Sequence, residues 1–269
     1  MVMRIAVTGS AGRMGKTLIG MLSSADDLTL GAAFERPESP ALGVDAGLHA
    51  GVGALGVTVS ADVAAALDDF DLLIDFSVPD ATLALLPLLT GAAKKLVIGT
   101  TGFDAGGEAA IRAAADRIPI LKASNMSMGV NVVFRLIEIA ARALGDEVDV
   151  EVIEAHHRDK IDAPSGTAMR MGEILAETLG RNLQTDAVYG RQGVTGPRDR
   201  KTIGFATIRG GDIVGEHTVL YAGAGERIEI THRAQSRANF AQGALRAARF
   251  LEGKAPGLYD MQDVLGISA

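Results

Sequence analysis

Continuously apolar segments alternate with helical segments through the first half of the chain. Between the apolar segments, residues such as Met14, Leu18 and Leu22 recur at helical spacing. Buried strands that alternate with helices predict a parallel sheet covered on both faces. The expected strands are Arg4–Val7, Thr29–Phe34, Leu72–Phe76, Leu96–Gly99 and Ile118–Ala123, with helices running to about Ser24 and near Ala61–Leu67, Ala81–Ala92 and Ala105–Arg117.

The pattern changes after about residue 129, where apolar residues begin to alternate with charged ones. Val150 and Val152 in the segment Asp149–Glu154 show this period of two, which predicts a mixed or antiparallel sheet. Further strands are expected at Thr202–Ile208, His217–Tyr221 and Arg227–Thr231, helices at Val130–Leu144, Ser165–Leu179 and Arg237–Leu251, and a long loop at Gln184–Lys201.

The fold class is therefore α/β, with an N-terminal doubly wound, Rossmann-type parallel sheet and a C-terminal α+β domain with a mixed or antiparallel sheet. A chain of 269 residues is long enough for two hydrophobic cores. We expect a dinucleotide-binding domain at 1–128 and a substrate-binding and oligomerisation domain at 129–236. The C-terminal helical segment 237–269 is expected to pack back onto the first domain.

Charge and cysteine content exclude several classes of protein. The chain has 26 basic and 33 acidic residues, a net charge of −7, which argues against nucleic-acid and membrane-surface binding. It has no cysteine, so disulfides and thiolate-bound metals are excluded. The sequence shows no signal peptide and no apolar run of about 20 residues, so we expect a cytoplasmic protein.

Three glycines follow the first expected strand, at positions 9, 12 and 15. Their spacing, G-x-x-G-x-x-G, is a variant of the dinucleotide fingerprint, in which glycines permit a tight turn and close approach to a pyrophosphate. The helix that follows would offer free N–H groups to phosphates. The alternative is that the glycines only form a tight turn.

An acidic residue and a basic residue close the second expected strand. Glu35 lies 20 residues after Gly15, where a carboxylate can accept hydrogen bonds from a ribose. The guanidinium of Arg36 suits a ribose phosphate. The pair predicts tolerance of both NADH and NADPH, and the alternative is that Arg36 is only a solvated surface charge.

Two later segments, Gly99–Phe103 and Ala123–Met126, follow expected parallel strands. Ligands of open α/β sheets bind beyond the carboxyl ends of strands. Their small and hydroxyl residues would let a nicotinamide and its ribose lie close to backbone. Read alone, each segment is an ordinary loop.

The densest cluster of titratable residues runs from Glu154 to Thr167 and holds His156 and His157, two of five histidines. An imidazole or a lysine such as Lys160 can donate a proton near neutral pH. Ser165 is a good N-cap, so the next residues would offer N–H groups to a carboxylate. The alternatives are a metal site and a plain charged loop. The metal site is disfavoured because His156 and His157, as adjacent residues of a strand, point in opposite directions.

The chain resembles the dihydrodipicolinate reductase family, also named 4-hydroxy-tetrahydrodipicolinate reductase, over essentially its full length. The most specific part of the resemblance is the segment from Glu154-Ala155-His156-His157 to Ala163-Pro164-Ser165-Gly166-Thr167. The other matching segments are Gly9–Gly15, Glu35-Arg36, Ile74-Asp75-Phe76, Gly99–Phe103, Asn125–Asn131, Thr202–Ala206 and Gly211–His217.

The resemblance implies NAD(P)H-dependent reduction of 4-hydroxy-tetrahydrodipicolinate in diaminopimelate and lysine biosynthesis, by a protein that is usually a homotetramer. It assigns His156 as the catalytic acid, Lys160 as a second proton donor, and His157, Gly166 and Thr167 to substrate binding. Residues assigned to the cofactor are Gly9, Ser10, Ala11, Gly12, Arg13, Met14, Glu35, Arg36, Gly99, Thr100, Thr101, Ala123, Ser124, Asn125 and Met126, and no metal is implied. The cofactor is expected to face the His/Lys stretch across a closable gap.

Three positions depart from the family pattern. Many members carry an arginine directly before a proline, where this chain has Val78-Pro79, so a preference for NADPH is in doubt. Lys122 and Met126 replace commoner small and aromatic residues near the expected nicotinamide pocket.

Two other functions are compatible with the front half of the chain. An aspartate or homoserine dehydrogenase would share the glycine turn but lack the segment 154–167 in this form. A catalytically idle dinucleotide sensor would need no proton donor, so the acid-and-cation cluster disfavours it.

Overall fold

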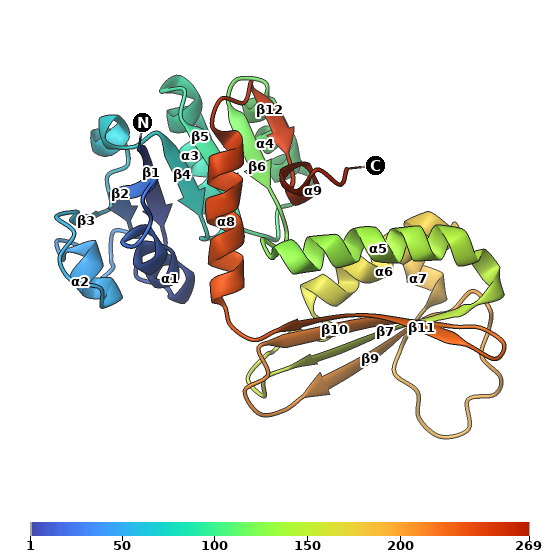
Figure 1. Cartoon of the computed structure of the whole chain (residues 1–269). Coiled ribbons are helices and arrows are strands. Elements are labelled where there is room, and N and C mark those ends of the chain that lie inside the picture. Colours follow the sequence, from blue (N-terminus) through green and yellow to red (C-terminus); the bar gives the residue numbers. More distant parts are fainter. Residues whose placement is uncertain (1, 269) are drawn as a thin grey trace. The chain divides into compact units, whose positions relative to one another are not determined.

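The structure is a computed structural model that describes residues 2–268. These residues form two compact units, of which unit 1 contains 2–128 and 237–268 and unit 2 contains Gly129–Ser236. Each unit is built on one sheet with helices packed against it (Figure 1).

The sheet of unit 1 has seven strands, and all of them pair in parallel. Its central strands are apolar on both faces, and all four residues of the strand Leu72–Asp75 are buried. The doubly wound sheet expected from the sequence is thereby confirmed. In sheet order the strands are β12 (Gly257–Tyr259), β6 (Pro119–Lys122), β5 (Lys95–Ile98), β4 (Leu72–Asp75), β1 (Met3–Thr8), β2 (Leu28–Phe34) and β3 (Val59–Ser60).

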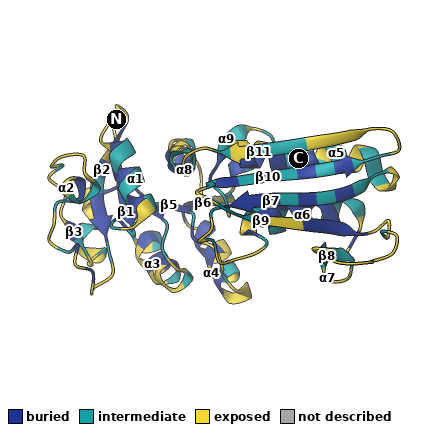
Figure 2. Ribbon diagram, turned by 90° about the horizontal axis from the view of Figure 1, so that it is seen from below, coloured by how far each residue is buried: buried dark blue, intermediate teal, exposed yellow. Residues whose placement is uncertain are grey.

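Helices cover both faces of this sheet and enclose two apolar layers. One layer joins the strands to α1 (Arg13–Leu22), α2 (Ala46–Ala50), α8 (Ala238–Leu251) and α9 (Met261–Leu265). The other joins them to α3 (Pro79–Gly91), α4 (Ala105–Ala115) and the 3-10 helix η1 (Ala64–Asp69). Figure 2 shows the resulting burial of the central strands. Because α8 packs against α1 and the sheet, the end of the chain completes the core of unit 1.

Unit 2 has a five-stranded mixed sheet, as the sequence predicted. The central strand β7 pairs in parallel with β9 and antiparallel with β10. In sheet order the strands are β11 (Arg227–Ala234), β10 (Gly215–Ala222), β7 (Asp149–His156), β9 (Ile203–Arg209) and β8 (Ala187–Tyr189). Helices α5 (Met128–Leu144), α6 (Gly166–Leu179) and α7 (Leu183–Asp186) cover one face of the sheet, and the 3-10 helix η2 (Gly145–Glu147) precedes β7.

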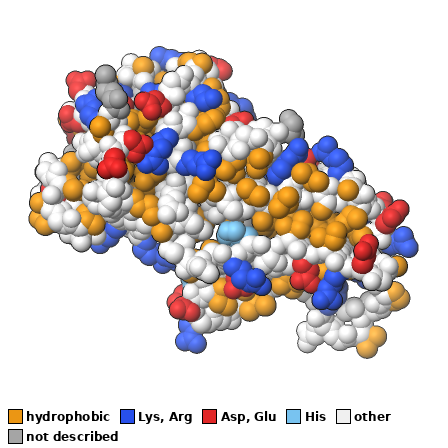
Figure 3. Space-filling view, viewed as in Figure 1, with side chains coloured by type: hydrophobic (Ala, Val, Ile, Leu, Met, Phe, Trp, Pro, Cys, Tyr) orange, Lys and Arg blue, Asp and Glu red, His pale blue; other side chains and the backbone are white. Residues whose placement is uncertain are grey.

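The period of two in β7 and β10 matches this one-sided packing. Val150, Val152, Val219 and Tyr221 are buried against the helices, and the hydroxyl of Tyr221 donates to the carbonyl of Ile137 at 2.6 Å. The residues between them point to the other face of the sheet, where Ile208 is exposed. Apolar side chains also gather over α5, where Val132, Leu136 and Ile139 are exposed (Figure 3).

The structure differs from the sequence predictions mainly in short elements. The segment Gln184–Lys201 was predicted as a loop, but α7 extends into it and β8 lies within it. A helix was expected near Ala61–Leu67, and the structure has the 3-10 helix η1 there, shifted by about one turn. Elements of two to five residues, such as β3 and α2, are too short to carry a measurable hydrophobic period. None of the helices within residues 2–268 is long and apolar enough to cross a membrane.

A buried carboxylate ties together the loops at the carboxyl edge of the unit 1 sheet. Asp75, the last residue of β4, has no exposed surface. Its Oδ1 accepts hydrogen bonds from the hydroxyls of Thr8 at 2.5 Å and Ser77 at 2.6 Å. Its Oδ2 accepts from Thr100 at 3.0 Å and from Thr82. One side chain thus connects the ends of β1 and β5 with the start of α3.

Replacement of Asp75 by alanine should strongly destabilise the protein. Four hydroxyls would lose their acceptor, and each buried unsatisfied group costs about 1–3 kcal/mol. We expect the free energy of unfolding, measured by urea denaturation, to fall by about 3 kcal/mol or more. The exposed Asp80→Ala in the first turn of α3 is the control and should cost at most about 1 kcal/mol. Equal stabilities for the two variants would contradict a structural role for the Asp75 network.

Candidate active site

The glycine turn of unit 1 is compact because backbone approaches backbone. Gly9 has a φ of 60°, and the N–H of Gly12 donates to its carbonyl at 2.9 Å. A Cβ at Gly15 would lie 2.3 Å from the carbonyl oxygen of Gly9, so only glycine allows α1 to start this close to the turn. Gly12 is the N-cap of α1, and no side chain caps the helix. The first N–H groups of α1 are therefore available to an anion.

Glu35 and Arg36 lie directly after β2, beside this turn. The Glu35 carboxylate accepts a hydrogen bond from the N–H of Ala11 at 2.9 Å, so it is held against the glycine turn. Arg36 is exposed. Both residues therefore lie at the end of β2, where the sequence predicts contact with a ribose.

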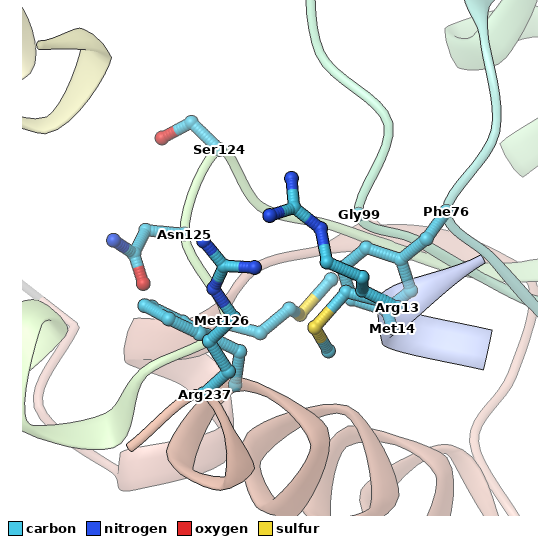
Figure 4. A pocket seen from close by; sticks show the side chains of 9 residues that line it. Arg13, Met14, Phe76, Gly99, Ser124, Asn125, Met126 and Arg237 are labelled. Carbon is cyan, nitrogen blue, oxygen red and sulfur yellow. The ribbon is translucent and has the colours of Figure 1, made fainter. Parts of the chain in front are cut away.

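A cavity of about 290 Å³ opens at the same edge of the unit 1 sheet (Figure 4). Six of the residues expected to bind the cofactor line it: Arg13, Met14, Gly99, Ser124, Asn125 and Met126. Phe76, Arg237 and Phe240 complete the lining and were not predicted. The two guanidinium groups extend into the space beside the Ser124–Asn125 segment, which makes this cavity suitable for an anionic ligand with a flat ring.

The other residues expected at the cofactor lie outside that lining. Gly9, Ser10, Ala11 and Gly12 form the adjoining turn, and Glu35 and Arg36 lie beside it after β2. Thr100 is bound to Asp75, Thr101 follows Thr100, and Ala123 precedes the lining residue Ser124. Lys122 also lies outside it, because its ammonium pairs with Glu108 at 2.6 Å and lies over the ring of Phe103. Of the two unusual residues near the pocket, only Met126 takes part in it.

The site in unit 2 is built around the carboxylate of Glu154, which is 2% exposed. Glu154 and His156 are two residues apart on β7, so their side chains share a face. The Nδ1 of His156 lies 2.6 Å from Oε2 of Glu154. Arg209 on β9 is the register partner of His156, and both of its terminal nitrogens donate to Glu154 at 2.8 Å.

The same carboxylate holds the start of α6. The N–H of Ser165 donates to Oε1 of Glu154 at 3.0 Å. Ser165 is the N-cap of α6, and its hydroxyl accepts from the N–H of Ala168 and lies 2.9 Å from Nε2 of His217. Gly166 and Thr167 are the first residues of this helix. The positive end of a 14-residue helix therefore lies beside the imidazole of His156.

The loop between β7 and α6 carries the cation of the cluster. The ammonium of Lys160 pairs with the carboxylate of Asp162 at 2.7 Å. The carbonyl of Asp162 accepts a hydrogen bond from Arg209 at 2.5 Å, and the carbonyl of His157 accepts from the N–H of Lys160 at 3.2 Å. His157 follows the end of β7 and is only partly buried. The structure thus connects His156, the start of α6 and the Lys160 loop through Glu154, Arg209 and Asp162, and His157 joins them through its backbone carbonyl.

Burial lowers the pKa of two histidines in the cluster. Desolvation lowers the pKa of His156, while the hydrogen bond and charge of Glu154 act in the opposite direction. Desolvation lowers the pKa of His217 to about 3, and the ring of His156, 5.0 Å away between centroids, adds to this effect. Glu154 itself keeps a lowered pKa despite its burial, because Arg209, His156 and the Ser165 N–H bind it.

This arrangement can receive a carboxylate and move a proton. Lys160 and the N-terminus of α6 supply positive charge, and Nε2 is the ring nitrogen of His156 that Glu154 leaves free. Within residues 2–268, no group of three or more histidine or acidic side chains is placed to hold a metal ion.

Sequence reasoning missed Arg209 and the link between Ser165 and His217. Glu154 could have been found, since a strand places it on the same face as His156. Arg209 lies 53 positions after His156, and only the pairing of β7 with β9 brings the two together. His217 lies in a strand that the sequence predicts, and its place beside Ser165 depends on the pairing of β10 with β7.

The buried, neutral His217 should make the protein less stable in acid. The pKa of His217 is about 6.5 in the unfolded chain and about 3 in the folded chain. Between these pH values only the unfolded chain binds the proton, so stability falls as the pH drops through this window. At pH 5 the loss relative to pH 7 is about 2 kcal/mol. In urea denaturation at both pH values, the loss of stability between pH 7 and pH 5 should be smaller for His217→Asn than for the unaltered protein. An unchanged pH dependence in the variant would contradict the neutral assignment.

Two family models and a curated relative match this chain. A family model described as the N-terminus of dihydrodipicolinate reductase matches residues 3–126, and one described as its C-terminus matches residues 129–265. A curated relative from Alkalilimnicola ehrlichii, named 4-hydroxy-tetrahydrodipicolinate reductase, is 59% identical over 267 residues, which are 99% of this chain and 100% of the relative.

Solved structures share the fold at low identity. A dihydrodipicolinate reductase from Paenisporosarcina sp. TG-14 with bound dipicolinate superposes with a TM-score of 0.77 at 21% identity, covering 98% of this chain and 99% of the other. GenD2 of gentamicin A biosynthesis, solved with NAD, gives a TM-score of 0.60 at 14% identity, covering 99% and 91%. The two family models and the full-length relative together show that the chain belongs to the dihydrodipicolinate reductase family.

Proposed function

We propose that the chain reduces 4-hydroxy-tetrahydrodipicolinate to tetrahydrodipicolinate, with NADH or NADPH held by unit 1 and protons handled by His156 and Lys160 of unit 2. The chain is an oxidoreductase of diaminopimelate and lysine biosynthesis, since both of its halves match the family and its full-length relative carries this activity.

One observation carries the assignment of roles in unit 2. A single buried carboxylate, Glu154, joins the imidazole of His156 to the start of α6. A proton-transfer group and a receptor for carboxylates are thus fixed next to each other on rigid elements. A cyclic dicarboxylate needs both, because one end must be bound while the ring reacts.

The glycine turn and the cavity of unit 1 fit a pyridine dinucleotide. Gly12, the N-cap of α1, lets a pyrophosphate approach the uncapped start of this helix, while Gly15 lets the helix pack against the backbone of the turn. Glu35 is placed to accept from a ribose, and the cavity with Met126 and Phe76 has apolar walls for the nicotinamide ring. A dihydronicotinamide bound there would supply the hydride for the reduction of the substrate ring.

The chain's own residues bind the substrate and handle its protons. Lys160 and the N–H groups of Gly166 and Thr167 hold the carboxylates, and His157 adds a partly exposed contact. His156, fixed through Nδ1, presents Nε2 as the atom that carries the proton. The reaction requires a hydride donor and a proton donor to act on one substrate molecule.

We also propose that the enzyme is a cytoplasmic homotetramer assembled through the sheet of unit 2. The face of this sheet that is turned away from the helices carries exposed Ile208 and partly exposed Ile153 and Leu220 between polar residues. Neighbouring copies would bury these side chains. The acidic net charge of −7 favours neither a nucleic-acid nor a membrane partner.

Cofactor preference should depend on Arg36. Since this chain has Glu35 for a free ribose and Arg36 for a phosphorylated one, we expect KM values for NADH and NADPH within a factor of about 100 of each other. Arg36→Ala should raise the KM for NADPH about tenfold and leave that for NADH unchanged. The exposed Arg117→Ala serves as control. A preference above a hundredfold in the unaltered enzyme would contradict dual use.

His156 and Lys160 should prove essential in an assay of NADH oxidation with freshly generated 4-hydroxy-tetrahydrodipicolinate. His156→Ala should lower kcat about a hundredfold or more, because the proton donor is lost. Lys160→Ala should lower kcat and raise the KM for the substrate, because the cation also binds a carboxylate. Arg170→Ala on the exposed face of α6 should change neither.

Three results would revise this assignment. Full activity of either variant would remove that residue from the mechanism. Activity with aspartate or homoserine instead would favour another dehydrogenase. Binding of NADH without turnover of any of these substrates would favour a sensor.

A further inference from the structure

Glu154 binds more partners than an orienting carboxylate needs. Its two oxygens accept from the imidazole of His156, from the N–H of Ser165 and from both terminal nitrogens of Arg209. These donors come from β7, from the start of α6 and from β9. The three donors belong to different parts of the cluster, and the Glu154 carboxylate is the acceptor that they share.

Arg209 extends this connection to the loop that carries Lys160. The nitrogen that binds Oε1 of Glu154 also donates to the carbonyl of Asp162 at 2.5 Å. Asp162 in turn pairs with the ammonium of Lys160. The guanidinium therefore touches both the partner of the imidazole and the partner of the cation.

We infer that the Glu154–Arg209 ion pair is a positioning device that holds the imidazole of His156, the start of α6 and the Lys160 loop in one arrangement, and sets how readily that imidazole keeps its proton. The inference rests on the proposed function, in which those three parts bind and protonate the substrate. Glu154 and Arg209 touch no substrate in this account and act through the groups they hold.

A role in stability alone explains this pair less well. Removing a carboxylate and a guanidinium from water is costly, and apolar side chains of the same size can replace such pairs without loss of stability. Glu154 is 2% exposed, and the Nε of Arg209 is buried without a hydrogen-bond partner among the described residues. A chain selected only for stability would gain little from this ion pair. A site that must hold an imidazole in one orientation needs the charge of the Glu154 carboxylate.

The electrostatic environment gives the two members of the pair opposite effects on His156. Four groups face the imidazole: Glu154 on β7, Arg209 on β9, Lys160 in the loop and His217 on β10. Glu154 favours the protonated ring, whereas Arg209 and Lys160 oppose it. His217 stays neutral and contributes no charge above about pH 3. Loss of Glu154 and loss of Arg209 should therefore move the pKa of His156 in opposite directions.

The test is a histidine titration by NMR on the full-length chain labelled with ¹³C at the imidazole ring, without ligands. The signal of His156 is identified by its absence in His156→Ala. We expect Glu154→Gln to lower the pKa of His156 by about one unit and Arg209→Gln to raise it by about one unit. Arg209→Lys keeps the positive charge and should shift the pKa less than Arg209→Gln.

Arg181→Gln is the matched control. Arg181 is also buried, pairs with Asp146 at 2.8 Å and donates to the carbonyl of Thr202, but neither partner contacts the cluster. Its loss should destabilise unit 2 and leave the His156 titration unchanged. If Arg209→Gln does not fold, Glu154→Gln, which has nearly the same shape as the wild-type residue, decides the question alone.

Shifts of opposite sign would support the inference, whereas an unchanged His156 pKa in the folded variants would overturn it. The activity assay separates this outcome from a failure of the proposed function. With His156 as the acid, the pH at which kcat declines should move down in Glu154→Gln and up in Arg209→Gln, with NADH affinity unchanged. If the NMR titration moves but the kcat profile stays in place, the positioning role stands and His156 is not the acid.

Discussion

The chemistry of unit 2 depends on a negative charge held out of water. A buried carboxylate is stable only when donors surround it, and Glu154 has them from its own strand, from the start of α6 and from β9. This requirement determines the local structure: β9 must lie beside β7 in the observed register, and α6 must start where Ser165 can donate. The same requirement places an imidazole, a helix N-terminus and a lysine loop together.

A comparable constraint acts in unit 1, where the close approach of backbone segments takes the place of a buried charge. The glycine turn allows α1 to begin against the end of β1, and the carboxylate of Asp75 fixes the neighbouring loops through hydroxyl groups. Both sites therefore lie at the ends of strands whose own residues are buried and rigid. The groups expected to bind ligands are held in place by neighbouring residues that are not expected to bind any.

Much of this could be predicted from the sequence, because the decisive patterns are local. The glycine spacing, the acidic residue 20 positions after Gly15 and the run from Glu154 to Thr167 each lie within one strand–loop–helix segment. Period-two alternation also predicted the mixed sheet correctly. The family resemblance, which the comparisons confirm, rests on those same segments.

What the sequence did not reveal depends on contacts between distant segments. Arg209 and His217 reach the cluster only through strand pairing, and Arg237 and Phe240 reach the cavity of unit 1 only because α8 returns to that unit. The short elements β8 and α7 were missed because a few residues next to a glycine-rich polar stretch carry no periodic signal. Local patterns thus identified the groups that we expect to react, and tertiary pairing supplied the groups that hold them.

The most direct test of the central claim is a crystal structure of the enzyme with NADH and pyridine-2,6-dicarboxylate bound. The account predicts one carboxylate on the N–H groups of Gly166 and Thr167, the Lys160 ammonium on a carboxylate, and the His156 ring and the nicotinamide both against the bound ring. A dicarboxylate bound elsewhere, with His156 and Lys160 in solvent and remote from the nicotinamide, would contradict it.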